Sequence, residues 1–291
     1  MRRSMLFLPG NNPNMLINGS SLGADAIIFD LEDAVSPDEK DAARILVQHT
    51  LAALKFGSGG VIIRINSLDT PYWEADVEAL APQGPDIIMP PKVGGAPDIH
   101  RLSAKLGEVE KKAGVQKKIL LMPLIETALG LENAFAVASC DERVTALFLG
   151  AEDLTADLRA FRTREGGEIA YARGRIICAA RAAGVDVMDT PFTDVNDLEG
   201  LREDALLARS LGFTGKALIS PRHVDVVNEV FSPGEKEIAY ARRVLEAIAE
   251  AGRQGKGAVS LDGKMIDPPI VERAKTVLRT AKELGLGGDY E

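Results

Sequence analysis

The sequence predicts an α/β fold: a (β/α)8 TIM barrel with a C-terminal helical extension. Three observations lead to this prediction. The chain has 291 residues, enough for one barrel of about 250 residues and an added segment. Short apolar runs recur along it, and most do not alternate with polar residues, as in parallel strands that are buried on both faces. Longer amphipathic segments separate these runs and would form the crossover helices.

Eight apolar runs are the expected strands, and all are rich in Ile, Leu, Val and Met. In chain order they cover residues 4–8, 26–31, 61–65, 86–89, 119–125, 146–149, 185–188 and 216–219. A doubly wound open sheet is the alternative, but no glycine-rich phosphate turn follows the first run. The barrel is therefore favoured.

The expected helices include residues 37–54, 170–183 and 194–211. Gly184 and Gly212 follow the last two, and a glycine just past the final turn commonly ends a helix. The pattern changes after residue 232. It predicts a charged helix over residues 233–250, a glycine-rich connection over 252–263, a turn over 265–269 and a helix over 270–284. We expect a barrel domain of residues 1–232 and an extension of residues 233–291, which packs on the barrel or contacts a neighbouring subunit.

The composition excludes several classes of function. The net charge of −9 argues against nucleic acid or an anionic membrane as the main partner. The chain has only three histidines, widely scattered, and two cysteines far apart in sequence, which argues against a zinc site or a Ser-His-Asp triad. We expect the two cysteines to be buried free thiols. No apolar run approaches the roughly 18 residues of a membrane span, and the first run is too short for a signal peptide. We expect a cytoplasmic protein.

Acidic residues gather where the expected strands end, which is the catalytic face of a barrel. They are Asp30, Glu32 and Asp33 after the second strand, Glu126 after the fifth, Glu152 and Asp153 after the sixth, and Asp189 after the seventh. Carboxylates crowded together cannot all ionise without a cation among them. A ligand set of oxygen atoms alone suits Mg2+ or Mn2+ better than zinc.

Two of these acids are the predicted metal ligands. Glu126 closes an apolar run, although a solvated strand-end carboxylate is the alternative reading. Asp153 is either a ligand or the N-cap of the next helix. Asp30 and Asp33 either hold metal-bound waters or serve as ordinary helix-start residues.

Two basic residues also lie at strand ends. Arg64 sits in an apolar strand, where an unpaired charge is costly, so it needs a carboxylate from the protein or from a substrate. Lys92 is a candidate Schiff-base lysine. The neighbouring acids would keep its ammonium protonated, which favours an ion pair or a phosphate contact.

Six segments carry a resemblance to a known family. They are RRSMLFLPGNNPNM, GADAIIFDLEDAVSPDEKDAAR, VIIRINSLDTPY, LLMPLIETALGLENA, LFLGAEDLTADL and SLDGKMIDPPIVERA. Together they resemble the citrate lyase beta/malyl-CoA lyase branch of the HpcH/HpaI aldolases, over essentially the whole chain. One departure is Ser220, since many relatives have histidine before the proline that follows. The stand-alone CoA-lyase relatives are therefore a slightly worse match.

The resemblance implies a TIM barrel with a helical extension, assembled as a homotrimer or hexamer and dependent on Mg2+. It implies that Glu126 and Asp153 ligate the metal and that Arg64 and Glu126 bind the substrate. It also implies that Asp267 acts as an acid/base residue in the site of an adjacent subunit; the sequence alone makes Asp267 a turn residue before Pro268.

The implied reaction is retro-Claisen cleavage of a citryl thioester, on CoA or an acyl carrier protein, to oxaloacetate and an acetyl thioester. The partners that the resemblance implies are a transferase (alpha) chain and an acyl carrier (gamma) chain. One alternative is a stand-alone malyl-, citramalyl- or β-methylmalyl-CoA lyase or a related thioesterase. The other is a non-catalytic assembly subunit, but an idle barrel has no reason to gather acids at its strand ends.

Overall fold

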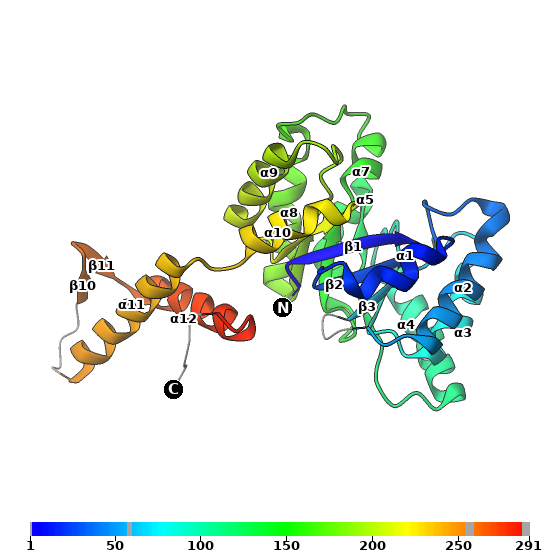
Figure 1. The fold of residues 1–291 in the computed structure, drawn as a ribbon, viewed down its shortest axis with the longest axis horizontal. Helices are drawn as coiled ribbons and strands as arrows, with labels where there is room; N and C mark the ends of the chain where they lie inside the picture. The colour runs from blue at the N-terminus through cyan, green and yellow to red at the C-terminus, as the bar shows by residue number, and fades with distance from the viewer. Residues whose placement is uncertain (1, 57–59, 254–258, 287–291) are drawn as a thin grey trace. The chain divides into compact units, whose positions relative to one another are not determined.

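The computed structural model describes residues 2–56, 60–253 and 259–286 (Figure 1). The chain forms two compact units, residues 2–228 and residues 229–291. The first unit holds one parallel sheet in the order β5-β4-β3-β2-β1-β9-β8-β7-β6. Its strands are β1 (Ser4–Pro9), β2 (Ala26–Asp30), β3 (Val61–Arg64), β4 (Ile87–Met89), β5 (Leu120–Leu121), β6 (Leu124–Ile125), β7 (Ala146–Leu149), β8 (Asp186–Asp189) and β9 (Gly215–Leu218).

The predicted fifth strand is present but split into β5 and β6 at Pro123. The segment still joins both of its neighbours. Met122 N–H donates to the Ile88 carbonyl of β4 at 3.0 Å, and Phe148 N–H of β7 donates to the Pro123 carbonyl at 3.0 Å. Proline has no N–H for the ladder, which accounts for the break. Counted as one strand, the segment closes the sheet, so all eight predicted strands and the barrel are confirmed.

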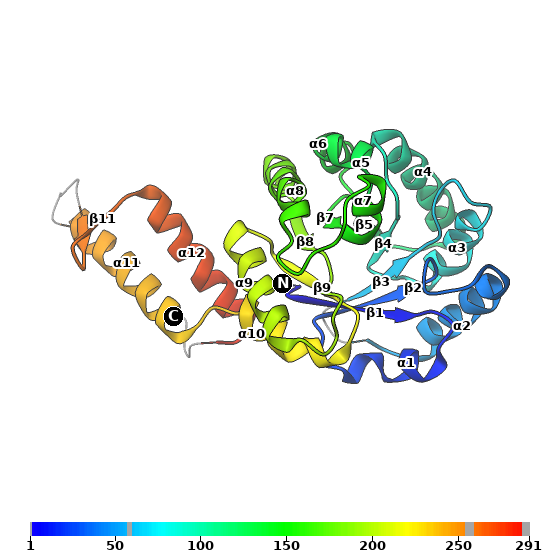
Figure 2. The same cartoon turned by 90° about the horizontal axis from the view of Figure 1, so that it is seen from above.

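Helices surround this sheet, as the view from above shows (Figure 2). They are α1 (Pro13–Asn18), α2 (Lys40–Ala53), α3 (Trp73–Leu80), α4 (Ala96–Ala113), α5 (Ala128–Glu132), α6 (Ala134–Ser139), α7 (Ala151–Asp157), α8 (Ala170–Ala183), α9 (Leu198–Leu211) and α10 (Val224–Phe231). Short 3-10 turns lie at η1 (Gly19–Ser21), η2 (Pro37–Glu39), η3 (Ala81–Gln83), η4 (Gly167–Ile169) and η5 (Pro221–His223).

The helix ends follow the sequence signals closely. Gly184 and Gly212 end α8 and α9 in the left-handed conformation, at φ +73° and +111°. Helix α9 begins four residues later than predicted, because the Asp197 side chain accepts the Gly200 N–H at 2.8 Å and caps the helix there. Cys140 and Cys178 are free as predicted, but Cys178 is exposed and Cys140 is half-buried.

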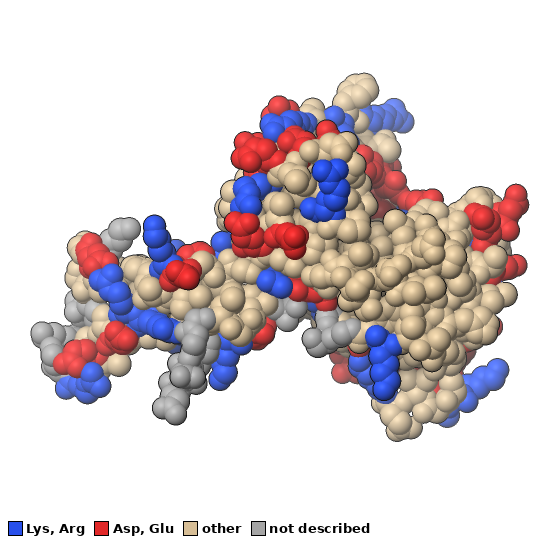
Figure 3. Space-filling view, viewed as in Figure 1, with Lys and Arg blue, Asp and Glu red and all other residues tan. Residues whose placement is uncertain are grey.

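The interior of the barrel is apolar and rich in methionine. Its core consists of Met5, Ala26, Ile28, Ile62, Ile87, Met89, Met122, Leu124, Ala146, Phe148, Met188 and Ala217. Among the described residues, no helix is both long and apolar enough to cross a membrane. On the face drawn in Figure 3, basic and acidic side chains are interspersed over the described surface, without one continuous basic patch.

A sealed ion-pair network joins β8 and β9 to α8 and α9. The Arg173 guanidinium donates to both oxygens of Asp189, at 3.0 and 2.8 Å, and to Asp204 at 2.7 Å. Lys216 Nζ lies 2.6 Å from Asp189 and 2.5 Å from Asp204. Arg173, Asp189 and Lys216 are almost completely buried. The two cations and two anions balance, which makes their burial tolerable.

The second unit contains α11 (Glu235–Arg253), β10 (Val259–Leu261), β11 (Lys264–Ile266) and α12 (Pro268–Glu283). Its small core includes Ala241, Val244, Ile266 and Ala274. The antiparallel pairing of β10 and β11 corrects the prediction, which placed a connection and a turn here. Asp262 and Gly263 both have positive φ, +51° and +74°, as a tight Asp-Gly hairpin turn requires. Residues 254–258 of the predicted connection lie outside the described residues.

Candidate active site

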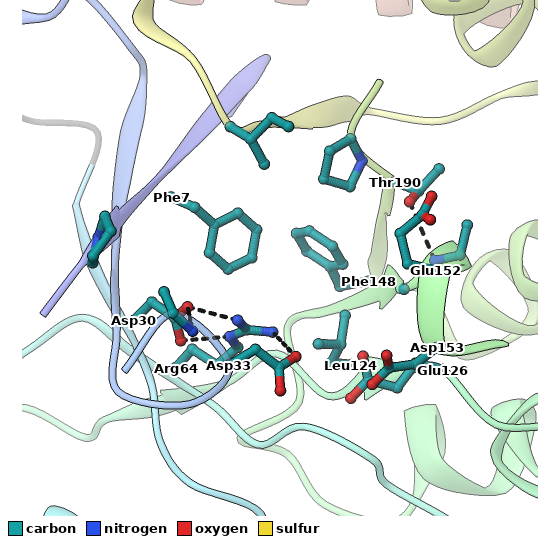
Figure 4. Close-up of a pocket in the computed structure, with 16 residues that line it drawn as sticks. Phe7, Asp30, Asp33, Arg64, Leu124, Glu126, Phe148, Glu152, Asp153 and Thr190 are labelled. Carbon is teal, nitrogen blue, oxygen red and sulfur yellow. Dashed lines mark hydrogen bonds and ion pairs between the residues drawn. The ribbon is translucent and has the colours of Figure 1, made fainter. Parts of the chain in front are cut away.

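A cavity of about 440 Å3 opens at the carboxyl ends of the barrel strands (Figure 4). One wall is apolar and includes Phe7 and Phe148, whose rings meet edge to face with centroids 5.9 Å apart. The lining also carries carboxylates from several strand ends: Asp30, Asp33, Glu126, Glu152 and Asp153. Most of the acids that the sequence placed at strand ends therefore lie around one cavity.

Glu126 and Asp153 lie side by side in the cavity lining (Figure 4). Glu126 follows β6 and is only 3% exposed, and its Oε1 accepts the Lys92 N–H at 2.7 Å. Burial, reinforced by the negative charges of Asp153 and Glu32, raises the pKa of Glu126 to about 8. Asp153 lies in the first turn of α7, and its buried Oδ2 has no hydrogen-bond partner among the described residues.

This pair fits a bound cation. Asp153 Oδ2 is buried and makes no hydrogen bond, although the Lys92 ammonium lies 3.4 Å away, and the neighbouring Glu126 resists ionisation. Positive charge between the two carboxylates would stabilise both. In the described part of the chain, no group of three or more His, Cys, Asp or Glu side chains forms a fuller cage. Mg2+ is commonly held by one or two carboxylates together with water or substrate oxygens, so two carboxylates such as Glu126 and Asp153 would be enough to hold it.

Arg64 finds its carboxylate partner within the protein. Its Nε and Nη2 donate to the two oxygens of Asp30 at 2.7 and 2.6 Å, and its Nη1 lies 3.1 Å from Glu32 Oε2. The guanidinium carbon also lies 5.0 Å from the centroid of the Phe7 ring. Burial opposes the charged form, but Asp30 and Glu32 outweigh it and raise the pKa of Arg64. The guanidinium is thus a fixed positive charge on the cavity wall.

Asp30 and Asp33 occupy different environments. Asp30 is buried against Arg64 and also accepts the backbone N–H groups of Glu32 and Ala34, at 2.9 and 3.3 Å. Its contacts are thus hydrogen bonds to the turn that follows β2 and an ion pair with Arg64. The Asp33 side chain is 56% exposed and lies 3.5 Å from Arg64 Nη1. A role for either residue in holding metal-bound water stays a prediction.

Glu32 is a strand-end acid to which the sequence assigned no role, although it pairs with both cations of the site. It is almost fully buried, and its carboxylate pairs with Lys92 Nζ at 2.6 Å as well as with Arg64. Burial raises the pKa of Glu32 despite these two cations. Strand alternation was the available signal, because the side chains of residues 30 and 32 point to the same side of an extended segment, while Leu31 points to the other.

Lys92 forms an ion pair, as the sequence favoured. Its Nζ lies 2.6 Å from Glu32 and 3.4 Å from Asp153 Oδ2. Burial lowers its pKa, but Glu32, Asp33 and Asp153 together raise it by more, so the side chain is a poor nucleophile. Lys92 has φ +53°, a left-handed conformation that is costly for a residue with a Cβ. This conformation aims both its N–H and its ammonium at the carboxylates.

Asp267 lies in the second unit, where it caps α12. Its side chain accepts the Ile270 N–H at 3.3 Å, and the residue is exposed. The cavity described above is lined by residues of the first unit. The proposed acid/base role of Asp267 in a neighbouring subunit stays a prediction.

Comparisons with known proteins agree with this geometry. The family model described as HpcH/HpaI aldolase/citrate lyase matches residues 3–221. The citrate lyase subunit beta of Leuconostoc mesenteroides subsp. cremoris is 45% identical over 282 residues, which cover 97% of this chain and 93% of that protein. The L-malyl-CoA/beta-methylmalyl-CoA lyase of Rhodobacter capsulatus is 34% identical over 302 residues, which cover 97% and 95%.

A solved structure extends the similarity to the fold. The Mycobacterium tuberculosis protein CitE, in complex with magnesium, acetoacetate and coenzyme A, superposes with a TM-score of 0.80 at 31% identity. The match covers 97% of this chain and 98% of that one.

Proposed function

The chain belongs to the HpcH/HpaI aldolase/citrate lyase family, and from this premise we propose that it is a Mg2+-dependent lyase that cleaves a citryl thioester to oxaloacetate and an acetyl thioester. The observation that carries the proposal is the paired Glu126 and Asp153 carboxylates beside the fixed Arg64 guanidinium. The relative at 45% identity is named as a citrate lyase subunit, and the similar solved structure contains magnesium, a keto acid and coenzyme A.

The residues divide the work of the reaction between them. Mg2+ bound by Glu126 and Asp153 would act as a Lewis acid toward the hydroxyl and carboxylate oxygens of the substrate. Asp30 holds the guanidinium of Arg64 rigidly, and the remaining N–H groups of Arg64 would orient a substrate carboxylate. The Phe7 and Phe148 wall would exclude water from the enolate.

Asp267 of an adjacent subunit is the proposed acid/base group. It would take the proton of the substrate hydroxyl while the bond between the carbinol carbon and the methylene carbon of the thioester arm breaks. The bond electrons would pass to the thioester as an enolate, and the proton would return to the methylene carbon. Oxaloacetate and an acetyl thioester result, with the proton count balanced.

The function is tested by incubating the protein and Mg2+ with a panel of CoA thioesters and identifying the keto acid released. We expect the highest kcat/KM with citryl-CoA, oxaloacetate as the product, and loss of turnover in EDTA that added Mg2+ restores. The 34% identity to a malyl-CoA lyase makes that activity the second candidate. Preferred release of glyoxylate from malyl-CoA, or of pyruvate from citramalyl-CoA, would favour the second candidate over the first.

The assembly is part of the same proposal. A carrier chain would deliver the thioester and a transferase chain would exchange the acyl group, while a homotrimer or hexamer would place Asp267 of one subunit in the site of the next. The cytoplasmic location also stays a prediction.

Mixing two inactive variants tests the subunit exchange. We expect Asp267→Asn and Glu126→Gln to be inactive alone, because each lacks one part of the site. After dissociation and reassembly of an equal mixture, roughly a quarter of the wild-type activity should return, because some sites then combine both intact residues. Mixed oligomers, verified by native mass spectrometry, that remain inactive would place Asp267 in its own chain's site. Activity of Asp267→Asn alone would place this residue outside the chemistry.

A further inference from the structure

Gly150 and Thr190 line the cavity beside the Glu126–Asp153 pair and have no chemical role in the proposed reaction, yet each contacts a segment that carries one of these carboxylates. We propose that Gly150 and Thr190 are positioning residues for the metal ligands, with Gly150 placing Glu126 and Thr190 placing the turn that carries Asp153. This inference rests on the proposed Mg2+ site. It concerns affinity for the cation, which is measurable without turnover.

Gly150 gives the Glu126 side chain its space. Its backbone has φ −99° and ψ 91°, an extended conformation open to any residue, so the chain does not need glycine for its torsion angles. A Cβ at this position would lie 2.6 Å from Glu126 Oε2 and 2.7 Å from Glu126 Cβ. Such contacts are too short for carbon, so even alanine would displace Glu126 or separate β6 from β7.

The Glu126 carboxylate is therefore held on two sides. Its Oε1 accepts the N–H of Lys92 at 2.7 Å, while its Oε2 faces the space that a Cβ at position 150 would fill. In Figure 4, Glu126 and Asp153 lie side by side at the edge of the cavity. A shift of Glu126 away from Gly150 would also change the geometry of the Lys92 contact, so one added methyl group would disturb the carboxylate on both sides.

Thr190 holds the start of α7 through a hydrogen bond from the end of β8. It follows β8 and is almost fully buried, and its Oγ1 accepts the N–H of Ala151 at 3.2 Å (Figure 4). The first N–H groups of a helix lack partners within it, so this hydroxyl satisfies a buried donor. The Thr190 carbonyl in turn accepts Lys216 Nζ at 2.7 Å. Thr190 thus ties the turn that leads into Asp153 to the sealed ion-pair network.

The test is Mg2+ affinity by calorimetry, with the melting temperature of the metal-free protein measured in parallel. Residues that orient metal ligands typically affect affinity by about 10- to 100-fold, and we expect Kd to rise by this factor in Gly150→Ala and in Thr190→Val. Valine keeps the shape of threonine but cannot accept the Ala151 N–H. Thr190→Ser keeps the hydroxyl and should stay within about threefold of the wild-type Kd.

A matched control is Gly174→Ala on α8, where an added Cβ meets nothing within 4 Å. Its Kd should not change. A folded Gly150→Ala with wild-type Kd would overturn the role of Gly150, and equal Kd values for Thr190→Val and Thr190→Ser would overturn that of Thr190. A variant with a lower melting temperature but unchanged Kd would show a structural role alone, which also overturns the inference.

If Gly150→Ala does not fold, the comparison of Kd between Thr190→Val and Thr190→Ser decides the inference. Absence of Mg2+ binding by the unaltered protein would instead overturn the metal site itself, and this inference with it.

Discussion

Replacement of Glu126 by glutamine is expected to lower kcat by at least about 100-fold and to abolish measurable Mg2+ binding, while the barrel stays folded. Glutamine has nearly the same shape and can still accept the Lys92 N–H, but it offers the cation no charge. Turnover with citryl-CoA and Mg2+ calorimetry would measure the two losses. Near-normal turnover or binding in this variant would contradict the proposed site.

The same variant has a predicted effect on stability. The pKa of Glu126 is about 8 in the folded protein against an ordinary value of 4.5, so the folded state binds the extra proton between these values. The contribution of this group to stability is complete below pH 4.5 and is lost as the pH rises toward 8. Metal-free Glu126→Gln has no such carboxylate, so it should melt at a higher temperature than the wild type at pH 8.

Calorimetry of metal-free wild type and metal-free Glu126→Gln from pH 5 to pH 9 checks the direction of this change in melting temperature. The difference in melting temperature should grow as the pH rises toward 8. Glu132→Gln, which alters an exposed glutamate on α5, is the matched control and should show no comparable trend. A difference that shrinks with rising pH would mean that Glu126 is ionised in the folded metal-free protein.

Replacement of Lys216 by methionine is expected to lower the free energy of unfolding by about 3–5 kcal/mol. Lys216 is fully buried between Asp189 and Asp204, so its loss leaves two carboxylates facing one guanidinium in a sealed site. Urea unfolding of the metal-free protein, followed by circular dichroism, measures the change. The exposed Lys275, which pairs with Glu272 on the surface of α12, is the control, and its replacement by methionine should cost less than about 1 kcal/mol.

A second substitution separates charge imbalance from loss of packing. Asp204→Asn in the Lys216→Met background removes one of the unbalanced carboxylates. We expect it to recover part of the lost stability, because Arg173 can still neutralise Asp189. Equal destabilisation by the two lysine variants, or no recovery in the double variant, would show that the network contributes little.

The sequence predicted the framework because strands and helix ends carry local signals. Apolar runs that do not alternate identified the eight strands, and these in turn placed Glu126 and Asp153 at the same end of the barrel. The break at Pro123 and the hairpin at Asp262 and Gly263 also had local signals. The hairpin was nevertheless read as part of a connection, because the glycine-rich residues before it dominated the pattern.

The pairings of buried charges could not be read in this way. Arg64 needed a carboxylate, but several acids were available and only the fold brings Asp30 against it. Lys216 looked like the first residue of an ordinary strand, since its partners lie on a preceding strand and helix. Such choices depend on distances between segments that are remote in sequence, and no periodicity encodes them.

Lys92 shows how narrowly one position can be constrained. Its left-handed backbone aims the N–H at Glu126, and its ammonium reaches Glu32 and Asp153. Glycine would adopt this backbone without strain but would lose the ammonium, whereas arginine would keep a positive charge but still bear the strain and a bulkier head group. No other natural amino acid combines both properties at lower cost. Every single substitution of Lys92 therefore either loses the positive charge or fits the left-handed backbone less well. A tolerated replacement would need a compensating change at Glu32 or Glu126.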